Sequence, residues 1–156
     1  WPGRSLDRIS WSGTELILSA AHNSESLSHD LSRLASEKHV LVVGMTQKED
    51  LSESIEPLLQ SEGRVQTIVT EVHGGRSPSV PAEHLSEHLS EHSDKSPLLI
   101  PNSIEAIDTA SRLASEEGCI VYVTGSVYLV GQAIEEIVSR EGGDLWDHLE
   151  AHPPSA

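Results

Sequence analysis

The sequence contains no phenylalanine, one cysteine, few basic side chains and no long apolar run. Because Cys119 is the only cysteine, it cannot form an internal disulfide, and we expect a reducing, cytoplasmic setting. Ten Lys and Arg against 25 Asp and Glu give a formal charge of −15, which argues against a nucleic-acid-binding surface or a basic membrane-surface helix. No apolar run approaches the roughly 20 residues that span a bilayer, so no transmembrane segment is expected.

The 156 residues contain enough aliphatic side chains for one domain with a real core. Aromatic residues are only 3% of the chain, so Val, Ile, Leu and Ala must form that core. Cys119 lies in an apolar run and is interpreted as a core residue rather than a nucleophile. The chain opens at Trp1 and its single methionine is Met45, from which we expect a piece of a longer protein.

Short apolar runs alternate with amphipathic stretches, a pattern typical of an α/β domain with a mostly parallel sheet. The expected strands are residues 16–18, 39–43, 65–69, 98–100 and 119–124, preceded by an edge strand within residues 1–11. The expected helices are residues 24–36, 51–60, 81–92, 103–116 (capped by Ser103) and 126–141.

Parallel strands joined by right-handed crossovers place their carboxyl ends along one edge of the sheet, where open α/β folds bind ligands. Polar side chains in the loops at that edge are therefore candidate ligand contacts. The loops expected there are residues 19–23, 44–50, 71–76, 102–103 and 125–126.

Three of these loops contain the strongest candidates. Gly125 and Ser126 join a buried strand to a helix, where backbone N–H groups and the Ser126 hydroxyl can bind an anion, or where Ser126 can be a helix cap. His22 and Asn23 offer several hydrogen-bonding groups, but a histidine at a helix start is also commonly a cap or surface residue. Lys48 can hold a carboxylate or phosphate, or can be a solvated loop lysine.

The loop at residues 44–50 matches no common nucleotide-binding motif. It has neither the G-K-[ST] ending of a Walker A loop nor a G-x-G-x-x-G fingerprint. A P-loop ATPase or a self-sufficient NAD enzyme is thereby disfavoured.

A four-residue repeat places His84, His88 and His92 at i, i+4 and i+8 of a helix, a spacing that can chelate zinc. Each histidine is adjacent to the Leu85/Leu89 stripe rather than within it. A solvated helix flank is therefore the favoured interpretation, and no metal site is predicted.

Several segments resemble one known family. Residues 1–4 read W-P-G-R, residues 18–23 read L-S-A-A-H-N, residues 44–50 form a glycine-initiated loop, Arg76 precedes the third helix, and residues 125–131 read G-S-V-Y-L-V-G. In the same order, these segments resemble five features of the family: the W-P-G-R linker, the sequence L-D-G-A-H-N, a loop with a D-K-D core, an arginine before the third helix, and the sequence G-S-L-Y-L-V-G. All occur in the C-terminal domain of the folylpolyglutamate synthase/dihydrofolate synthase family, relatives of the Mur peptide ligases.

The resemblance implies a Rossmann-like three-layer domain of the Mur ligase C-terminal type at residues 12–142. Residues 1–11 would be a linker and antiparallel edge strand from a missing upstream ATPase domain, and residues 143–156 a tail. Family members phosphorylate a folate or pteroate carboxylate with ATP, and the amine of L-glutamate attacks the acyl phosphate. ATP and Mg would be bound mainly by the upstream domain, so the isolated chain, expected to be a monomer, would be inactive.

The resemblance also implies roles for individual residues. His22 and Ser126 would bind glutamate, Arg4 and Ser19 would lie near the nucleotide, and Asn23, Lys48 and Arg76 would line the cleft.

The chain departs from the family pattern at several positions. Ser19 replaces the aspartate expected at the ribose, which predicts weaker nucleotide binding and a gain in ATP affinity for Ser19→Asp. Gln47 and Glu49 replace the aspartates of the D-K-D core, and Ser24 replaces a proline. A Mur-type cell-wall peptide ligase domain and a non-catalytic ligand-binding module of the same fold are the alternative functions.

Overall fold

The computed structural model describes residues 7–34, 37–59, 62–74, 77–90 and 96–141. The strands are β1 (Asp7–Trp11), β2 (Thr14–Leu18), β3 (His39–Val43), β4 (Arg64–Val69), β5 (Leu98–Leu99) and β6 (Ile120–Thr124). The helices are α1 (Ser24–Leu34), α2 (Leu51–Leu59), α3 (Ala82–Ser90), α4 (Ser103–Glu117) and α5 (Val127–Glu141). None of the helices in these described ranges is both long and apolar enough to cross a membrane.

The strands form one six-stranded sheet in the order β1-β2-β6-β3-β4-β5. β1 pairs antiparallel with β2, and the remaining neighbours pair in parallel. Val43 at the end of β3 is in register with Thr124 of β6 and Val69 of β4, so the carboxyl ends of these strands are level. The predicted α/β class, with a mostly parallel sheet and an antiparallel N-terminal edge strand, is confirmed.

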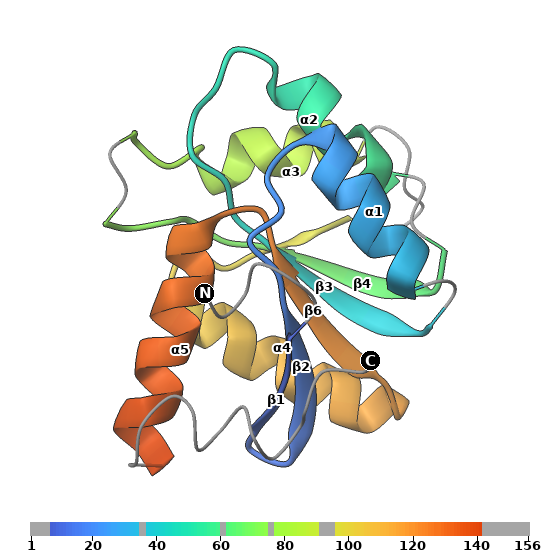
Figure 1. The fold of residues 1–156 in the computed structure, drawn as a ribbon, viewed down its shortest axis with the longest axis vertical. Coiled ribbons are helices and arrows are strands. Elements are labelled where there is room, and N and C mark those ends of the chain that lie inside the picture. Colours follow the sequence, from blue (N-terminus) through green and yellow to red (C-terminus); the bar gives the residue numbers. More distant parts are fainter. Residues whose placement is uncertain (1–6, 35–36, 60–61, 75–76, 91–95, 142–156) are drawn as a thin grey trace.

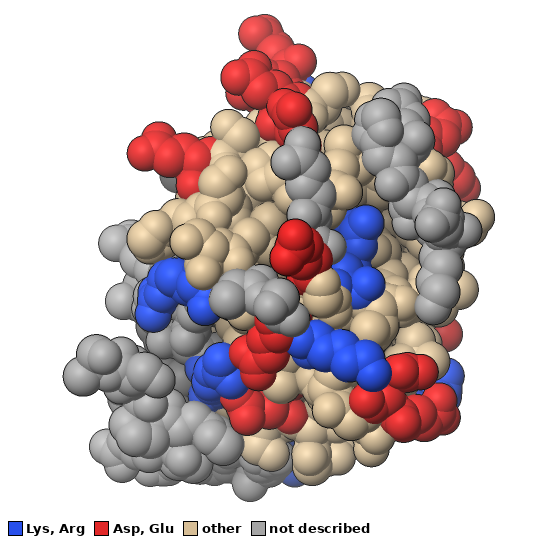
Figure 2. All heavy atoms as spheres, turned by 90° about the vertical axis from the view of Figure 1, so that its right-hand side faces the viewer, with Lys and Arg blue, Asp and Glu red and all other residues tan. Residues whose placement is uncertain are grey.

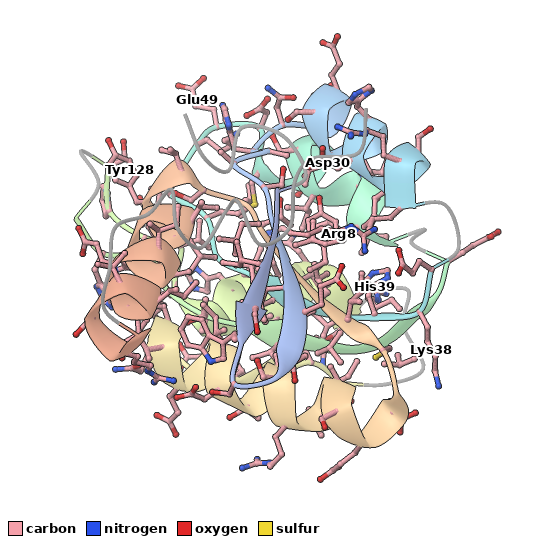
Figure 3. All side chains as sticks on the ribbon, turned by 60° about the horizontal axis from the view of Figure 1, so that its bottom comes forward. Arg8, Asp30, Lys38, His39, Glu49 and Tyr128 are labelled. Carbon is pink, nitrogen blue, oxygen red and sulfur yellow. The ribbon has the colours of Figure 1, made fainter. Side chains whose placement is uncertain are left out.

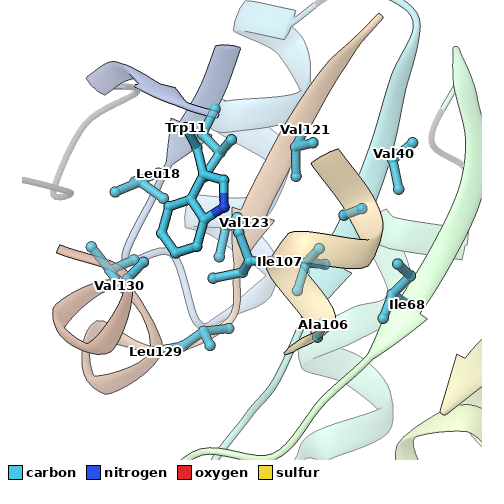
Figure 4. Packing of buried hydrophobic residues seen from close by; sticks show 14 of the residues in the cluster. Trp11, Leu18, Val40, Ile68, Ala106, Ile107, Val121, Val123, Leu129 and Val130 are labelled. Atoms are coloured by element: carbon cyan, nitrogen blue, oxygen red, sulfur yellow. The ribbon is translucent and has the colours of Figure 1, made fainter. Parts of the chain in front are cut away.

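Helices cover both faces of the sheet, as Figure 1 shows: α1, α2 and α3 on one face, and α4 and α5 on the other. The central strands are buried on both sides, so neighbouring residues of one strand enter different cores. Val40 and Val42 pack with α4 and α5, whereas Leu41 and Val43 pack with α1, α2 and α3. Figure 4 shows the first of these cores.

Trp11 fixes β1 to the helices of the first core. Its indole is 2% exposed, and Nε1 donates a hydrogen bond of 2.8 Å to Asp108 Oδ1 on α4. Arg140 of α5 lies over the Trp11 ring, 4.8 Å from its centroid, and makes two hydrogen bonds of 2.9 Å to the Asp108 carboxylate. One aromatic side chain and one ion pair thus connect β1, α4 and α5.

The first turn of α4 corrects one sequence prediction. Asn102, not Ser103, is the N-cap, because the Asn102 side chain accepts a hydrogen bond of 2.9 Å from the Glu105 N–H. The Ser103 hydroxyl instead donates to Gln132 Oε1 of α5 at 3.2 Å. Asn and Ser are both good caps, so residue preference alone could not separate these neighbouring positions.

Basic and acidic side chains lie next to each other on the face shown in Figure 2. Among the pairs that the structure describes, Arg8 contacts Glu15 and Glu37, and Lys38 contacts Glu117. The visible Lys and Arg residues are therefore interspersed with carboxylates rather than gathered into a continuous basic surface.

Candidate functional site

A cavity of about 180 Å³, the first pocket, opens at the carboxyl edge of the sheet. It lies where the loops after β2, β3 and β6 meet the start of α5. Its lining consists of His22, Met45, Thr46, Lys48, Gly125, Ser126, Val127 and Tyr128. The structure therefore brings His22, Lys48 and Ser126 together, although 26 and 78 residues separate them along the chain.

Gly125 allows these loops to approach closely. Its φ is +112°, and an added Cβ would lie 2.3 Å from the Gly44 carbonyl oxygen, so only glycine fits without movement of the backbone. The Gly125 N–H donates to the Ala21 carbonyl at 3.0 Å, and the Gly44 N–H donates to the Thr124 carbonyl at 3.4 Å. Backbone hydrogen bonds thus hold the three loops against one another.

Ser126 is the N-cap of α5. Its hydroxyl accepts a hydrogen bond of 3.1 Å from the Tyr128 N–H, and its carbonyl accepts one of 3.2 Å from Val130. The side chain is only 4% exposed but still contributes to the pocket lining. The amino end of a 15-residue helix therefore faces the cavity, and its dipole favours a negative group there.

His22 is exposed in the loop after β2, and hydrogen bonding fixes the orientation of its ring. His22 Nδ1 lies 3.0 Å from the Ala20 carbonyl oxygen. Because a carbonyl oxygen can only accept, Nδ1 must carry the proton, and in the neutral ring Nε2 is left as an acceptor.

Lys48 connects the loop after β3 to the loop after β2. It is partly buried, and its ammonium group donates a hydrogen bond to the His22 carbonyl oxygen. Lys48 therefore has a defined backbone partner while its side chain stays partly exposed, and its binding of an anionic group stays a prediction. Lys48 thus adds a positive charge to the pocket lining, on a loop that the hydrogen bond from Gln47 N to the Pro78 carbonyl helps to hold.

Two of the other predicted site residues, Asn23 and Ser19, are absent from the described lining of this pocket. Asn23 caps α1, where its side chain accepts a hydrogen bond of 2.9 Å from the Ser26 N–H. Ser19 is fully buried and donates its hydroxyl proton to Asp30 of α1. Arg4 and Arg76 lie outside the described residues. Ligand roles for these four residues remain predictions.

A second pocket of about 420 Å³ lies beside the first and shares Lys48 with it. It is lined by Gln47, Lys48, Leu51, Val80, Pro81, His84, Glu87 and His88. The helical spacing predicts a solvated flank for His84 and His88, and no cavity was expected there. The Leu85/Leu89 stripe turns α3 inward as expected and leaves the histidine flank along the rim, next to the 44–50 loop.

The described part of α3 does not form a metal centre. Among the residues that the structure places, no group of three or more His, Cys, Asp or Glu side chains is arranged to hold a metal ion. His88 Nδ1 instead lies 3.3 Å from the Ser52 hydroxyl of α2, and His92 is outside the described residues.

Comparison with known proteins identifies the family. Residues 4–136 match the family model described as dihydrofolate synthetase, C-terminal domain. A comparison with curated protein sequences gives no significant match.

Solved structures of larger enzymes contain a domain with the same fold. Mycobacterium tuberculosis folylpolyglutamate synthase complexed with ADP and AMPPCP matches with a TM-score of 0.74 and 24% identity over 90% of this chain and 33% of its own. E. coli FolC in complex with ADP matches with a TM-score of 0.69 and 23% identity over 92% and 33%. A bifunctional folylpolyglutamate synthase/dihydrofolate synthase with Mn, AMPPNP and L-glutamate bound matches with a TM-score of 0.64 and 24% identity over 88% and 32%.

This chain therefore spans about a third of the length of those enzymes. The predicted relationship to the folylpolyglutamate synthase/dihydrofolate synthase group is confirmed by the family match together with the shared fold. With most of its residues covered by the family model, the chain belongs to the family of dihydrofolate synthetase C-terminal domains.

Proposed function

We propose that this domain binds L-glutamate within an ATP-dependent ligase that joins glutamate to a folate or pteroate carboxylate. The observation that carries the proposal is the meeting of His22, Lys48 and Ser126 around the first pocket. Drug-sized ligands occupy pockets of about 300–1,000 Å³. A cavity of about 180 Å³ is better suited to one amino acid than to a whole folate.

The lining offers a complementary partner for each polar group of an amino acid. The amino end of α5 at Ser126 suits the α-carboxylate, because helix N-termini bind anions. His22 Nε2 accepts an N–H of the amine and thereby orients the nitrogen lone pair. The ammonium of Lys48 balances the second carboxylate, which distinguishes glutamate from an uncharged amino acid.

The reaction joins this amine to an activated carboxyl group. The amine nitrogen forms a bond to the acyl carbon, the bond to the phosphate oxygen breaks, and inorganic phosphate leaves with the electron pair. The amine must lose a proton in this step, and in this proposal His22 Nε2, in the described lining, accepts that proton. The domain thus contributes by holding and orienting the nucleophile.

In this proposal a domain upstream of this chain makes most of the contacts with the nucleotide. Mg²⁺ prefers carboxylate and phosphate oxygens, whereas none of the described residues that line the first pocket has a carboxylate. In this proposal Arg4 lies near the phosphates of the nucleotide and Ser19 lies below the loop that faces the nucleotide. Asn23 and Arg76 line the cleft around the first pocket.

Ser126→Ala in the full-length enzyme tests the glutamate role. Loss of the hydroxyl should raise the KM for glutamate about tenfold, the effect of roughly 1.4 kcal/mol, and change the KM for ATP much less. Ser103→Ala is the matched control, since Ser103 is also 4% exposed and begins α4 away from the pocket. Equal effects of Ser126→Ala on both KM values would remove Ser126 from the proposed role.

The same enzyme assay separates the alternative functions. A folylpolyglutamate synthase-type ligase incorporates glutamate into a folate, whereas a Mur-type ligase requires a cell-wall peptide precursor as its acceptor. Binding of glutamate without any ATP-dependent incorporation into either acceptor would favour the non-catalytic module.

A further inference from the structure

Asp30 on α1 is a buried carboxylate directly beneath the loop that contains His22. The residue is 5% exposed, and its Oδ2 accepts hydrogen bonds from the hydroxyls of Ser19 and of Tyr122, the latter at 3.0 Å. Figure 3 shows its place on α1. Among the residues that the structure describes, no basic side chain pairs with this carboxylate.

Burial of a carboxylate without a basic partner costs folding free energy unless hydrogen bonds satisfy its oxygen atoms. Tyr122 has no exposed surface, and desolvation raises the pKa of its phenol well above the ordinary value. The hydroxyl therefore remains protonated and donates to Asp30. Ser19, also fully buried, supplies the other donor.

Ser19 connects this buried carboxylate to the 19–23 loop. The Ser19 hydroxyl oxygen accepts a hydrogen bond of 3.3 Å from the Ala21 N–H. The Ala21 carbonyl accepts from the Gly125 N–H at 3.0 Å and from the Thr124 hydroxyl at 3.3 Å. A continuous series of hydrogen bonds thus runs from α1 through the loop to the start of α5.

We propose that Asp30 is a positioning residue whose carboxylate, acting through Ser19, fixes the 19–23 loop and so the orientation of His22 at the first pocket. The consequence for glutamate rests on the proposed function, but the effect on the loop does not. Tyr122 bonds to the same carboxylate oxygen and also contacts the Ser19 hydroxyl, but it makes no described hydrogen bond to residues 20–23, so its loss should disturb the loop less than the loss of the Ser19 hydroxyl.

The first experiment measures the loop directly, by NMR of the 156-residue chain without ligand. Ser19→Ala and Asp30→Asn should shift the backbone amide signals of residues 20–23 and the ring signals of His22. Tyr122→Phe removes one hydrogen bond from Asp30 and a contact with Ser19 but keeps the Ser19–Asp30 hydrogen bond, so it should lower the melting temperature and shift the loop signals less than Ser19→Ala does. Unchanged loop signals in Ser19→Ala, or an equal shift in Tyr122→Phe, would overturn the proposal.

An exchange of side chains tests the same hydrogen bond without removing it. Ser19→Asp alone places two carboxylates side by side in a buried site, so the chain should be destabilised. The double variant Ser19→Asp/Asp30→Ser restores one carboxylate and one hydroxyl, and it should recover both the melting temperature and the loop signals. If the loop signals of the double variant lie no closer to the wild-type positions than those of Ser19→Asp do, positioning through this pair is contradicted.

The second experiment measures glutamate kinetics in the full-length enzyme. Misplacement of His22 should raise the KM for glutamate about tenfold in Ser19→Ala, while the KM for ATP of this variant changes less. Tyr122→Phe should raise the KM for glutamate less than Ser19→Ala does. If the wild-type enzyme does not use glutamate, the proposed function fails, and the NMR comparison alone decides the role of Asp30. Normal glutamate KM values in a Ser19→Ala enzyme that uses glutamate would count against positioning.

Discussion

Gly125 is the residue on which the geometry of the first pocket depends most strictly. Its positive φ and its contact with the Gly44 carbonyl oxygen leave no room for a side chain. Gly125→Ala should therefore lower the free energy of unfolding by about 1–3 kcal/mol, because the backbone must adopt a strained conformation or the loops must separate. Urea unfolding followed by circular dichroism measures this loss.

Gly131 offers the matched control for Gly125. It lies within α5, and an added Cβ would meet nothing within 4 Å. Gly131→Ala should raise the stability by about 0.5–1 kcal/mol, because alanine loses less backbone entropy in a helix. Equal destabilisation by both alanine variants would show that loss of glycine alone, rather than the contact at Gly44, matters.

At the scale of single residues, the sequence predicted where three polar side chains of the pocket lie better than it predicted their contacts. Strand-to-helix junctions placed His22, Lys48 and Ser126 at one edge of the sheet, and the structure puts them in one lining. The hydrogen bond from Lys48 to His22 and the burial of Ser19 against Asp30 could not be predicted. Both depend on side chains that are distant in sequence.

At the scale of elements, the connection of β1, α4 and α5 through Asp108 has a pH dependence. The hydrogen bonds from Arg140, and secondarily the one from Trp11, hold the pKa of Asp108 below its ordinary value. A lowered carboxyl pKa stabilises the fold above the unfolded-state pKa of about 3.9. That contribution is lost as the pH falls through the lower folded-state pKa.

Asp108→Asn tests this connection. At pH 7 the variant should be less stable than wild type by at most about 1 kcal/mol, because the side chains of Arg140 and Asp108 are 37% and 44% exposed and water screens the pair. The difference should shrink as the pH falls below about 4, where the carboxylate is protonated first in the unfolded state and, at lower pH, in the folded state. Unfolding curves at pH 7, 4 and 2.5 measure it, and a constant difference across these curves would contradict the electrostatic origin.

The elements also show where sequence patterns fix structure and where they do not. The buried run at residues 39–43 was predicted with the observed bounds of β3, because hydrophobicity and length both define a central strand. β5 is shorter than predicted, and Leu98 and Leu99 are 41% and 47% exposed. A short apolar run at a sheet edge has the same composition as a buried strand, so exposure there depends on its place in the sheet.

At the scale of the whole molecule, the second pocket shows the limit of a loop-by-loop analysis. Its walls come from the 44–50 loop and from residues 80–88, which approach each other through the Thr46–Ser79 bridge and the hydrogen bond of 2.8 Å from Gln47 N to the Pro78 carbonyl. Neither contact follows from local propensity. A cavity formed by two segments about 30 residues apart requires the assembled fold.

The whole chain is expected to bind nucleotide poorly without the rest of the enzyme. It spans about a third of the length of its structural relatives, its first pocket has a volume of about 180 Å³, and its formal charge is −15, which repels an anionic nucleotide. Isothermal titration calorimetry of the 156-residue chain with Mg-ATP should therefore give no dissociation constant in the micromolar range, and a phosphate-release assay should detect no hydrolysis. The full-length enzyme is the control in both assays. Micromolar ATP binding by the chain alone would place the nucleotide site within this domain and would require the division of roles between the two domains to be abandoned.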